Sequence, residues 1–389
     1  MKTLLSILFS ILTVGISAQS YTRTVNDILD QPEKKSGIYR ISGTYLKTAV
    51  VNMNYGQSDI LSVMDRKELQ NANIIQIDLV YTNFPKGQDI SELNKQRILK
   101  MLSIRSDLVK STGISWSVVR QMYCKDEAQA KMLFHGAVIY YQPEQSQALN
   151  SYELEQYEVL PKDDKIKITE ETLKQFSDDP VILKVMERNT WNNPTIVADV
   201  TCSMSPYIKQ TAFWFLLKMN KSKNANIVLF NDGDGKANQL KTVGSTGGLH
   251  SVATKEYKEF RELLLKSVSY GCSGDADEND IEAILEAQKK YPKAEEIILI
   301  ADNFSNMRDY RLIPKIKVPV RVILCGTKYT INVQYLNLAR ETGGSVHSIE
   351  QDLNDLINKS EGDSFNFMGK KYTIKDGQII EKISTTTRI

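Results

Sequence analysis

The chain has few of the residues that build disulfide frameworks and zinc sites. Of its 389 residues, four are cysteine and three are histidine. Four cysteines in a chain of this length are too few for a disulfide framework, and they lack the paired CxxC spacing of a zinc site. The histidines show no spacing typical of a metal-binding pair. We therefore expect most of the cysteines to be small buried apolar side chains.

An excess of charge of one sign is also missing. The 49 lysines and arginines nearly balance the 47 aspartates and glutamates, and the two signs are mixed along the chain, with a formal net charge of +2. This pattern is typical of a solvated surface and predicts no nucleic-acid partner. The contents of charged residues (25%) and hydrophobic residues (41%) are ordinary for a soluble globular protein, and the length allows two domains.

Long apolar segments are absent apart from one short run at the start. Lys2 precedes an apolar stretch over residues 4–12, and the segment ends in Ser17-Ala18. The run is too short to span a bilayer, but one charge, an apolar centre and a small residue at the end are typical of a secretory signal peptide. We predict that residues 1–18 are a cleaved signal peptide, that the mature chain has no membrane span, and that it is secreted or periplasmic.

Residues 19–145 predict a small N-terminal domain of the α/β or α+β class. Three β-branched or apolar segments predict strands, at 74–81, 115–122 and 137–141. Two segments with helical periodicity predict helices, at 90–102 and 126–134. Residues 37–45 are interpreted as a short hairpin, and the polar residues 146–176 as a linker.

Over residues 177–358, segments that predict strands alternate with segments that predict helices. The expected strands are 195–198, 227–230, 296–301, 318–325 and 345–349. The expected helices are 181–188, 207–219, 257–268, 281–290, 333–341 and 352–357. This alternation predicts an α/β domain with a doubly wound, mainly parallel sheet covered by helices on both faces. In the tail, residues 359–389, Asp376-Gly377 between two apolar pairs predicts a β-hairpin.

Polar side chains follow two strands of the predicted parallel sheet. Asp199, Thr201 and Ser203 come directly after the first of these strands, and Asp302 follows the third. The carboxyl ends of parallel strands meet at one edge of a sheet, which is where open α/β sheets bind ligands. Carboxylate and hydroxyl oxygens suit Mg²⁺, Mn²⁺ or Ca²⁺ better than zinc or copper.

A loop at residues 269–279, directly before a predicted helix, is the third piece of the expected site. It offers Ser273, Asp275 and Asp277 as competing oxygen ligands, of which we choose Asp275.

Together these pieces resemble the metal-ion-dependent adhesion site of the von Willebrand factor A domain family. The Asp-x-Thr-x-Ser segment that begins at Asp199 is similar to the family's Asp-x-Ser-x-Ser. The loop with Asp275 and Glu278 resembles a Gly-Gly-Asp-x-Pro-Glu loop of one branch of the family, and the turn at Asp302 resembles its Asp-Gly turn. The resemblance covers residues 190–358.

The resemblance implies the Rossmann-like fold of that family and a divalent cation held by Asp199, Thr201, Ser203, Asp275 and Asp302. Mg²⁺ is the first choice, with Mn²⁺ or Ca²⁺ as alternatives. The hydroxyl ligands neutralise none of the charge of the metal, and a position left open can take a carboxylate from a partner protein. We therefore expect an exported protein-binding module of the adhesion type, not an enzyme, whose partner presents Asp or Glu.

Cys202 lies within the first motif and Cys272 within the loop, so both are expected beside the same metal. Two interpretations stay open: a disulfide that ties the two loops together, or two reduced thiols.

Two other functions stay open as alternatives. An Asp at the end of the first strand, with Mg²⁺, also describes phosphohydrolases of the haloacid-dehalogenase type, but these need a second Asp two residues later, where this chain has Thr201. The chain also lacks the Gly-x-Ser-x-Gly motif of α/β-hydrolases. The second alternative is a structural scaffold in which the N-terminal domain does the binding.

Overall fold

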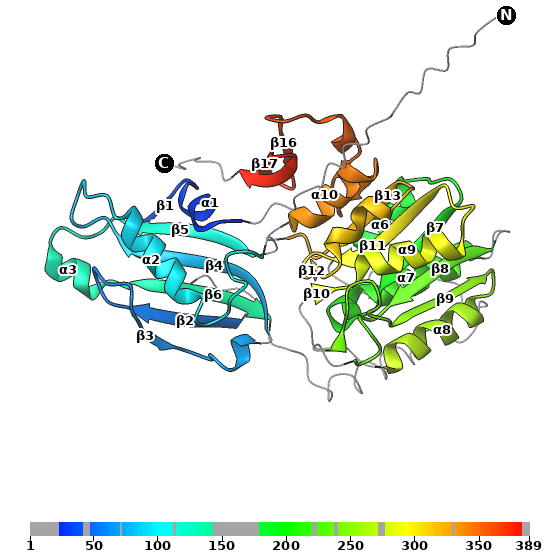
Figure 1. The fold of residues 1–389 in the computed structure, drawn as a ribbon, viewed down its shortest axis with the longest axis horizontal. Coiled ribbons are helices and arrows are strands. Elements are labelled where there is room, and N and C mark those ends of the chain that lie inside the picture. Colours follow the sequence, from blue (N-terminus) through cyan, green and yellow to red (C-terminus); the bar gives the residue numbers. More distant parts are fainter. Residues whose placement is uncertain are drawn as a thin grey trace, which may run out of the picture.

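The computed structural model describes residues 23–41, 47–70, 72–111, 114–142, 179–219, 224–236, 240–270, 277–328 and 331–382. They form a mixed α/β protein in which two large sheets and two smaller ones combine parallel and antiparallel pairings (Figure 1). Within these ranges, no helix is both long and apolar enough to cross a bilayer. The predicted signal peptide (1–18) and linker (146–176) lie outside the described residues.

The N-terminal sheet has six strands. Their order is β1 (Lys34–Ser36), β5 (Ser115–Gln121), β4 (Asn73–Thr82), β6 (Gly136–Gln142), β2 (Lys47–Met53) and β3 (Ile60–Val63). The pairs β1–β5 and β4–β5 are parallel, and the remaining pairs are antiparallel. Helices α1 (Val25–Leu29) and α2 (Ser91–Met101) bury Ile28, Ile98 and Met101 against this sheet. Helix α3 (Glu127–Met132) precedes β6 and is capped by Asp126, which accepts a hydrogen bond from Gln129 N.

The strands and helices predicted in this part are all present, with ends that differ by a few residues. The predicted hairpin at 37–45 is wrong where it is described, because residues 37–41 contain no strand; residues 42–46 lie outside the described residues. Strands β1, β2 and β3 were not predicted. Strand β3 pairs with the nearby β2, but β1 and β2 pair with distant segments: Lys34 pairs with Val119 and Lys47 with Tyr141. Such strands depend on long-range contacts more than on local pattern.

The second large sheet has seven strands. Their order is β15 (Asp352–Leu353), β14 (Ser345–His347), β13 (Val320–Cys325), β11 (Glu296–Asp302), β7 (Pro194–Asp199), β8 (Ala225–Phe230) and β9 (Leu249–Thr254). Strands β14, β13, β11, β7 and β8 run parallel, and β9 and β15 pair antiparallel at the two edges. A two-stranded parallel pair, β10 (Asp277–Glu278) and β12 (Asn306–Met307), lies beside it.

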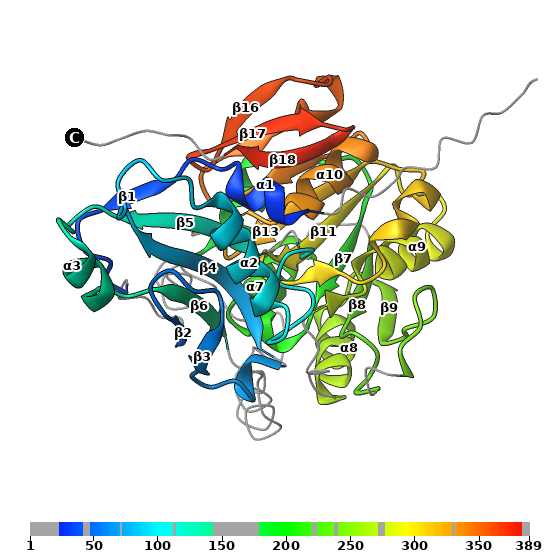
Figure 2. The same ribbon diagram turned by 60° about the vertical axis from the view of Figure 1, so that its left-hand side comes forward.

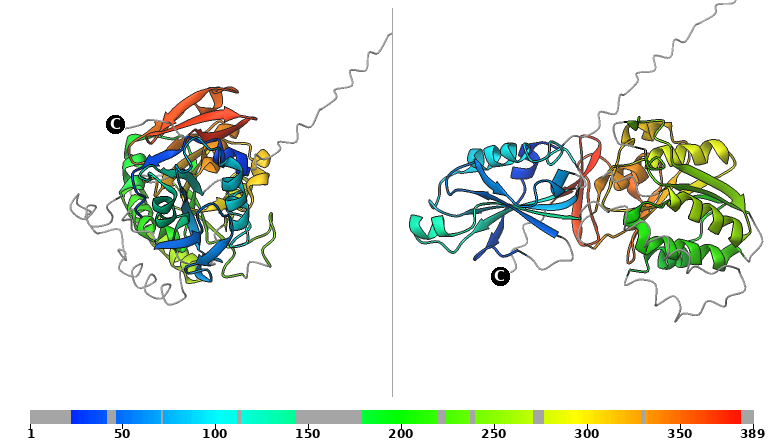
Figure 3. Two further views of the ribbon diagram at one scale, coloured as in Figure 1. Left: turned by 90° about the vertical axis from the view of Figure 1, so that its left-hand side faces the viewer. Right: turned by 90° about the horizontal axis from the view of Figure 1, so that it is seen from below.

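Helices cover both faces of this sheet (Figure 3). Along β7, Ile196 and Ala198 pack with α6 (Val181–Arg188), α7 (Ser205–Met219) and α8 (Tyr257–Ser269). Val197 faces the opposite way, toward α9 (Asp280–Lys290) and α10 (Val333–Glu341). Strand residues alternate between the two faces of a sheet, so an apolar strand such as β7 requires a helical layer on each side.

This part differs from the sequence prediction in several places; strands β9, β10 and β12, for example, were not predicted. The helix predicted at 352–357 is wrong: Asp352 and Leu353 form β15, and a short 3-10 helix, η5 (Leu356–Asn358), follows. Antiparallel pairing with β14 determines the conformation there. Helix α6 begins at Val181, as predicted. Its N-cap, Pro180, makes no side-chain capping hydrogen bond, and Gln210 accepts the hydrogen bond of Ile182 N.

The C-terminal residues form a three-stranded antiparallel sheet, β16 (Ser364–Phe367), β17 (Lys370–Lys375) and β18 (Gln378–Lys382). The predicted hairpin is present as β17–β18. Its turn residues Asp376 and Gly377 have φ values of 51° and 74°, as a tight hairpin turn with two left-handed residues requires. The sheet packs on α10, where Asn337 Oδ1 accepts a 2.7 Å hydrogen bond from Ile379 N.

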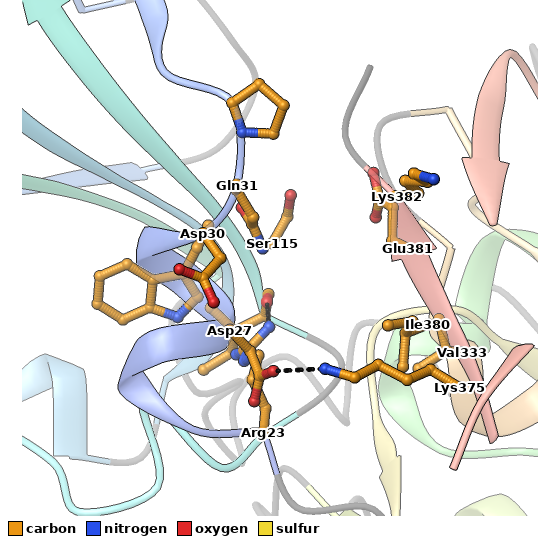
Figure 4. Close-up of a pocket in the computed structure, with 13 residues that line it drawn as sticks. Arg23, Asp27, Asp30, Gln31, Ser115, Val333, Lys375, Ile380, Glu381 and Lys382 are labelled. Carbon is orange, nitrogen blue, oxygen red and sulfur yellow. Dashed lines mark hydrogen bonds and ion pairs between the residues drawn. The ribbon is translucent and has the colours of Figure 1, made fainter. Parts of the chain in front are cut away.

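The C-terminal sheet also lies beside α1 of the N-terminal part (Figure 2). Lys375 Nζ is 3.6 Å from Asp27 Oδ1, and this ion pair crosses a cavity of about 300 Å³ between the two (Figure 4). A second connection joins Asn306, in β12, to the Ser111 hydroxyl through a hydrogen bond. Helix α1 and the loop before β5 therefore connect the N-terminal part to the C-terminal sheet and to the segment that follows Asp302.

Candidate metal centre

Asp199 and Asp302 are the last residues of two neighbouring parallel strands. Strands β7 and β11 pair along their length, with Ala198 opposite Ile300, so both carboxylates lie at the same end of the sheet. Both side chains are buried, with exposed fractions of 2% for Asp199 and 0% for Asp302. The position at a carboxyl edge is where α/β sheets bind ligands.

The turn after β7 brings the two predicted hydroxyl ligands together. Asp199 Oδ1 accepts a 2.7 Å hydrogen bond from Thr201 N, and the hydroxyls of Thr201 and Ser203 are 3.1 Å apart. The chain then enters the short 3-10 helix η2 (Cys202–Met204), which leads into α7. Asp199, Thr201 and Ser203 therefore form one local unit.

Asp302 uses one carboxylate oxygen for its own turn. Its Oδ1 accepts hydrogen bonds from Phe304 N (2.6 Å) and Ser305 N (2.9 Å). Its Oδ2 is buried and makes no hydrogen bond within the described part of the chain. Burial raises the pKa of Asp302, and the Ser203 hydroxyl, which lies close to it, opposes that shift. Ser203 thus connects the two halves of the candidate site.

The electrostatics of the site favour a bound cation. Burial and then the charge of Asp302 raise the pKa of the Asp199 carboxyl well above its usual value. Two buried carboxylates that repel each other are costly, and a divalent cation between them would remove that cost. Two carboxylates and two hydroxyls are also a suitable donor set for a hard cation. Within the described ranges, no three His, Cys, Asp or Glu side chains are grouped to hold a metal, so such a site would need its hydroxyls.

Sequence reasoning did not assign site roles to two acidic residues, Glu278 and Asp280, that the structure places nearby. Both are buried, and Glu278 Oε2 and Asp280 Oδ2 have no hydrogen-bond partner among the described residues. Burial, followed by the charges of Asp199, Asp232 and Asp302, raises the pKa of Glu278 well above its usual value. Acidic residues that follow a loop are ordinarily solvated, so only the tertiary structure shows that these two are buried close to Asp199 and Asp302.

Asp232, a further buried carboxylate of this region, binds two cationic side chains. It lies in the turn at residues 231–235, which follows β8, and it is buried with a left-handed φ of 57°. Its Oδ2 is 2.7 Å from Lys241 Nζ and 3.0 Å from an Arg308 guanidinium nitrogen. Arg308 also donates a hydrogen bond to the backbone carbonyl of Asp277. These two cations are thereby held beside the buried acids.

Asp275 and Cys272, the loop residues of the predicted site, lie outside the described residues. Cys202 is disulfide-bonded, whereas Cys124 and Cys325 are buried free thiols. The interpretation of two reduced thiols is therefore wrong for Cys202. Its pairing with Cys272 stays a hypothesis.

Ser345, His347 and Asp352 have the order of a catalytic Ser-His-Asp triad, but the serine and the histidine are buried, so no substrate can reach them. Ser345 Oγ is 2.7 Å from His347 Nε2, and His347 Nδ1 is 2.8 Å from Asp352 Oδ1. Ser345 and His347 are 1% and 0% exposed in the interior of the sheet. Arg188 also binds both oxygens of Asp352. We interpret these hydrogen-bonded side chains as a structural network.

No family model matches this chain, and no curated protein or solved structure matches it either. Its function is therefore argued from the site itself.

Proposed function

We propose that the protein is an exported, metal-dependent protein-binding module whose residues 177–358 form a doubly wound domain of the von Willebrand factor A type. The parallel strands, the helices on both faces and the polar residues at one carboxyl edge support this proposal. The observation that carries it is the burial of Asp199 and Asp302 at one site, with Asp302 Oδ2 left without a hydrogen bond among the described residues. Export is proposed from the signal-like residues 1–18.

In this proposal, Asp199, Thr201, Ser203 and Asp302 hold a divalent cation, with Asp275 as the loop ligand. Mg²⁺ is the first choice, and Mn²⁺ and Ca²⁺ are the alternatives. When bound, the cation supplies an open coordination position that accepts an Asp or Glu carboxylate of a partner protein. The residues of the chain fix the two hydroxyls 3.1 Å apart and keep water away from the carboxylates by burial.

Metal binding is tested by titrating Mg²⁺ into the full chain in a calorimeter, with wild type and Asp302→Ala side by side. Asp59→Ala is the matched control, because Asp59 is 75% exposed and lies in the N-terminal part. The wild type and the control should bind one cation, and Asp302→Ala should not. Equal binding by all three would contradict the proposed site.

Partner binding is tested by affinity capture from the native host with wild type and Asp199→Ala. A partner retained by the wild type in Mg²⁺ and released by EDTA supports the module. If the partner is retained in EDTA and also by Asp199→Ala, the result contradicts the metal-dependent module and favours the scaffold alternative. A phosphatase activity that is lost in Asp199→Asn would favour the phosphohydrolase alternative instead.

A further inference from the structure

A cavity of about 360 Å³ lies in the N-terminal part, remote in sequence from the candidate metal centre. It is bounded by the end of β4, the loop from β4 to α2, and the turn between β2 and β3. Helix α2 connects the parallel strands β4 and β5, so the cavity lies at the carboxyl end of a parallel strand. That is the usual ligand position in such a crossover, and the volume falls within the range of small-molecule sites.

Arg97, in α2, lines this cavity and is buried, with 1% of its surface exposed. Its guanidinium donates to three oxygens, all of them uncharged: Gln57 O at 2.9 Å, Asn54 O at 3.2 Å and Asn94 Oδ1 at 3.4 Å. A guanidinium has five N–H groups, so these bonds leave two of them unused. Within the described residues no carboxylate pairs with Arg97, which is unusual for a buried charge.

The charge on Arg97 is retained at neutral pH. Burial lowers its pKa to about 10, which still leaves the guanidinium protonated at pH 7. The one acid that lines the cavity, Asp89, is exposed and accepts a hydrogen bond from Ser91 N. The cavity therefore has a cation at its buried side with no compensating anion.

His135 offers a complementary group beside Arg97. It is 5% exposed, and its Nε2 lies 2.8 Å from the carbonyl oxygen of Ala130. A carbonyl oxygen only accepts, so Nε2 carries the proton and Nδ1 is an acceptor. Nδ1 is buried without a hydrogen-bond partner in the described structure. Burial lowers the pKa of His135, which keeps the ring neutral.

Aromatic rings form the remaining walls. Tyr55 meets the His135 ring edge to face, with centroids 5.4 Å apart. Tyr81 is buried, and the Arg120 guanidinium lies 5.6 Å from its ring centroid. Phe84 completes the wall and is half-buried. Flat apolar walls of this kind suit a planar apolar group.

We propose that this cavity binds a small aromatic carboxylate that carries a hydroxyl or N–H donor next to its acid group. The carboxylate accepts from the unused N–H groups of Arg97, the donor bonds His135 Nδ1, and the ring packs among Tyr55, Tyr81 and Phe84. Ligand and protein then satisfy each other's buried polar groups. This function is independent of the proposed metal centre and gives the N-terminal part a role of its own.

The test titrates 3-phenyllactate into the full chain by calorimetry, in EDTA, so that a metal site plays no part. Two related compounds separate the contacts: 3-phenyllactamide lacks the charge and 3-phenylpropionate lacks the hydroxyl. We expect 3-phenyllactate to bind with a Kd of about 1 mM or below, and each related compound to bind about tenfold more weakly.

Two variants locate the binding without removing Arg97, whose loss could unfold the chain. Leu93→Trp places a larger side chain into the cavity from α2 and should abolish binding, whereas Leu99→Trp, at a 40% exposed position of the same helix, should leave it unchanged. The proposal is overturned if 3-phenyllactate does not bind at about 1 mM, if the amide binds as tightly as the acid, or if folded Leu93→Trp binds like the wild type.

Discussion

Asp199 and Asp302 end neighbouring parallel strands and bury their carboxylates at one site, where the charge of Asp302 adds to burial in raising the pKa of Asp199. The pair is unfavourable in itself and is suited to a cation. The two carboxylates should destabilise the protein without metal and stabilise it with metal. Measurements of stability can therefore test the site even though no partner is known.

Replacing Asp302 by Asn should have opposite effects with and without metal. In EDTA, we expect Asp302→Asn to raise the free energy of unfolding by about 1–2 kcal/mol, because it removes one of two repelling charges. In Mg²⁺ at about one hundred times Kd, the free energy of unfolding of the wild type should rise by about 2.7 kcal/mol and that of the variant should not change. Urea unfolding, with EDTA and with Mg²⁺, measures both free energies. A variant that Mg²⁺ stabilises as much as the wild type would show that Asp302 is not a ligand; Asp59→Asn controls for the change of charge.

Asp309 should make stability fall as the pH rises from about 4 to about 7. Burial is the main cause that raises its pKa to about 7, although Ile281 N and Glu282 N donate to it at the start of α9. In this window the folded state keeps a proton that the unfolded state has lost. The contribution of Asp309 is therefore fully present below the unfolded pKa and lost by pH 7, at up to about 1.4 kcal/mol per pH unit.

Urea unfolding of wild type and Asp309→Asn across that pH range isolates this contribution. The difference between the two proteins should change with pH in the stated direction, since Asn does not titrate. Parallel stability profiles would show that the pKa of Asp309 is the same in the folded and unfolded states.

Arg188→Met should destabilise the edge of the second sheet. Arg188 donates to both oxygens of Asp352 and to the carbonyl of Ile349, which ties α6 to β15. Its loss leaves a partly buried carboxylate beside His347, so we expect a cost of about 1–3 kcal/mol in thermal or urea unfolding. Lys258→Met is the control, because that side chain is 79% exposed and its ion pair with Glu262 is 3.9 Å long. Similar effects of both substitutions would argue against a special role for Arg188.

A peptide map under non-reducing conditions should contain a fragment that joins Cys202 to Cys272. Cys202 is disulfide-bonded, and Cys124 and Cys325 should react with an alkylating reagent only after unfolding, because they are buried thiols. Reduction should loosen the loops beside the proposed metal and weaken Mg²⁺ binding. Recovery of alkylated Cys272 from unreduced protein would exclude the predicted pair.

The local sequence pattern was sufficient to predict the positions of the most apolar strands and of the most regular helices. Strands β7 and β11 are continuous apolar segments buried on both faces, and α10 has a clear helical period, so their positions follow from composition and spacing. The same holds for Asp199, Thr201 and Ser203, which one turn brings together, and for Asp302, whose position at a strand end follows from the alternation of strands and helices.

Only the tertiary structure decided the features that depend on distant partners. Residues 352–357 have a helical pattern, yet pairing with β14 and the contact with Arg188 make Asp352 part of a strand. Glu278 belongs to a loop that resembles a family motif, but its burial beside Asp199 and Asp302 comes from the fold, in which β10 pairs with β12. Arg97 likewise acquires a buried, unneutralised charge from the way α2 packs against a turn forty residues earlier. The sequence alone determined where apolar segments and neighbouring polar side chains lie, since these are properties of neighbours along the chain. Burial and electrostatic coupling were decided by the fold, because they depend on which remote groups exclude water.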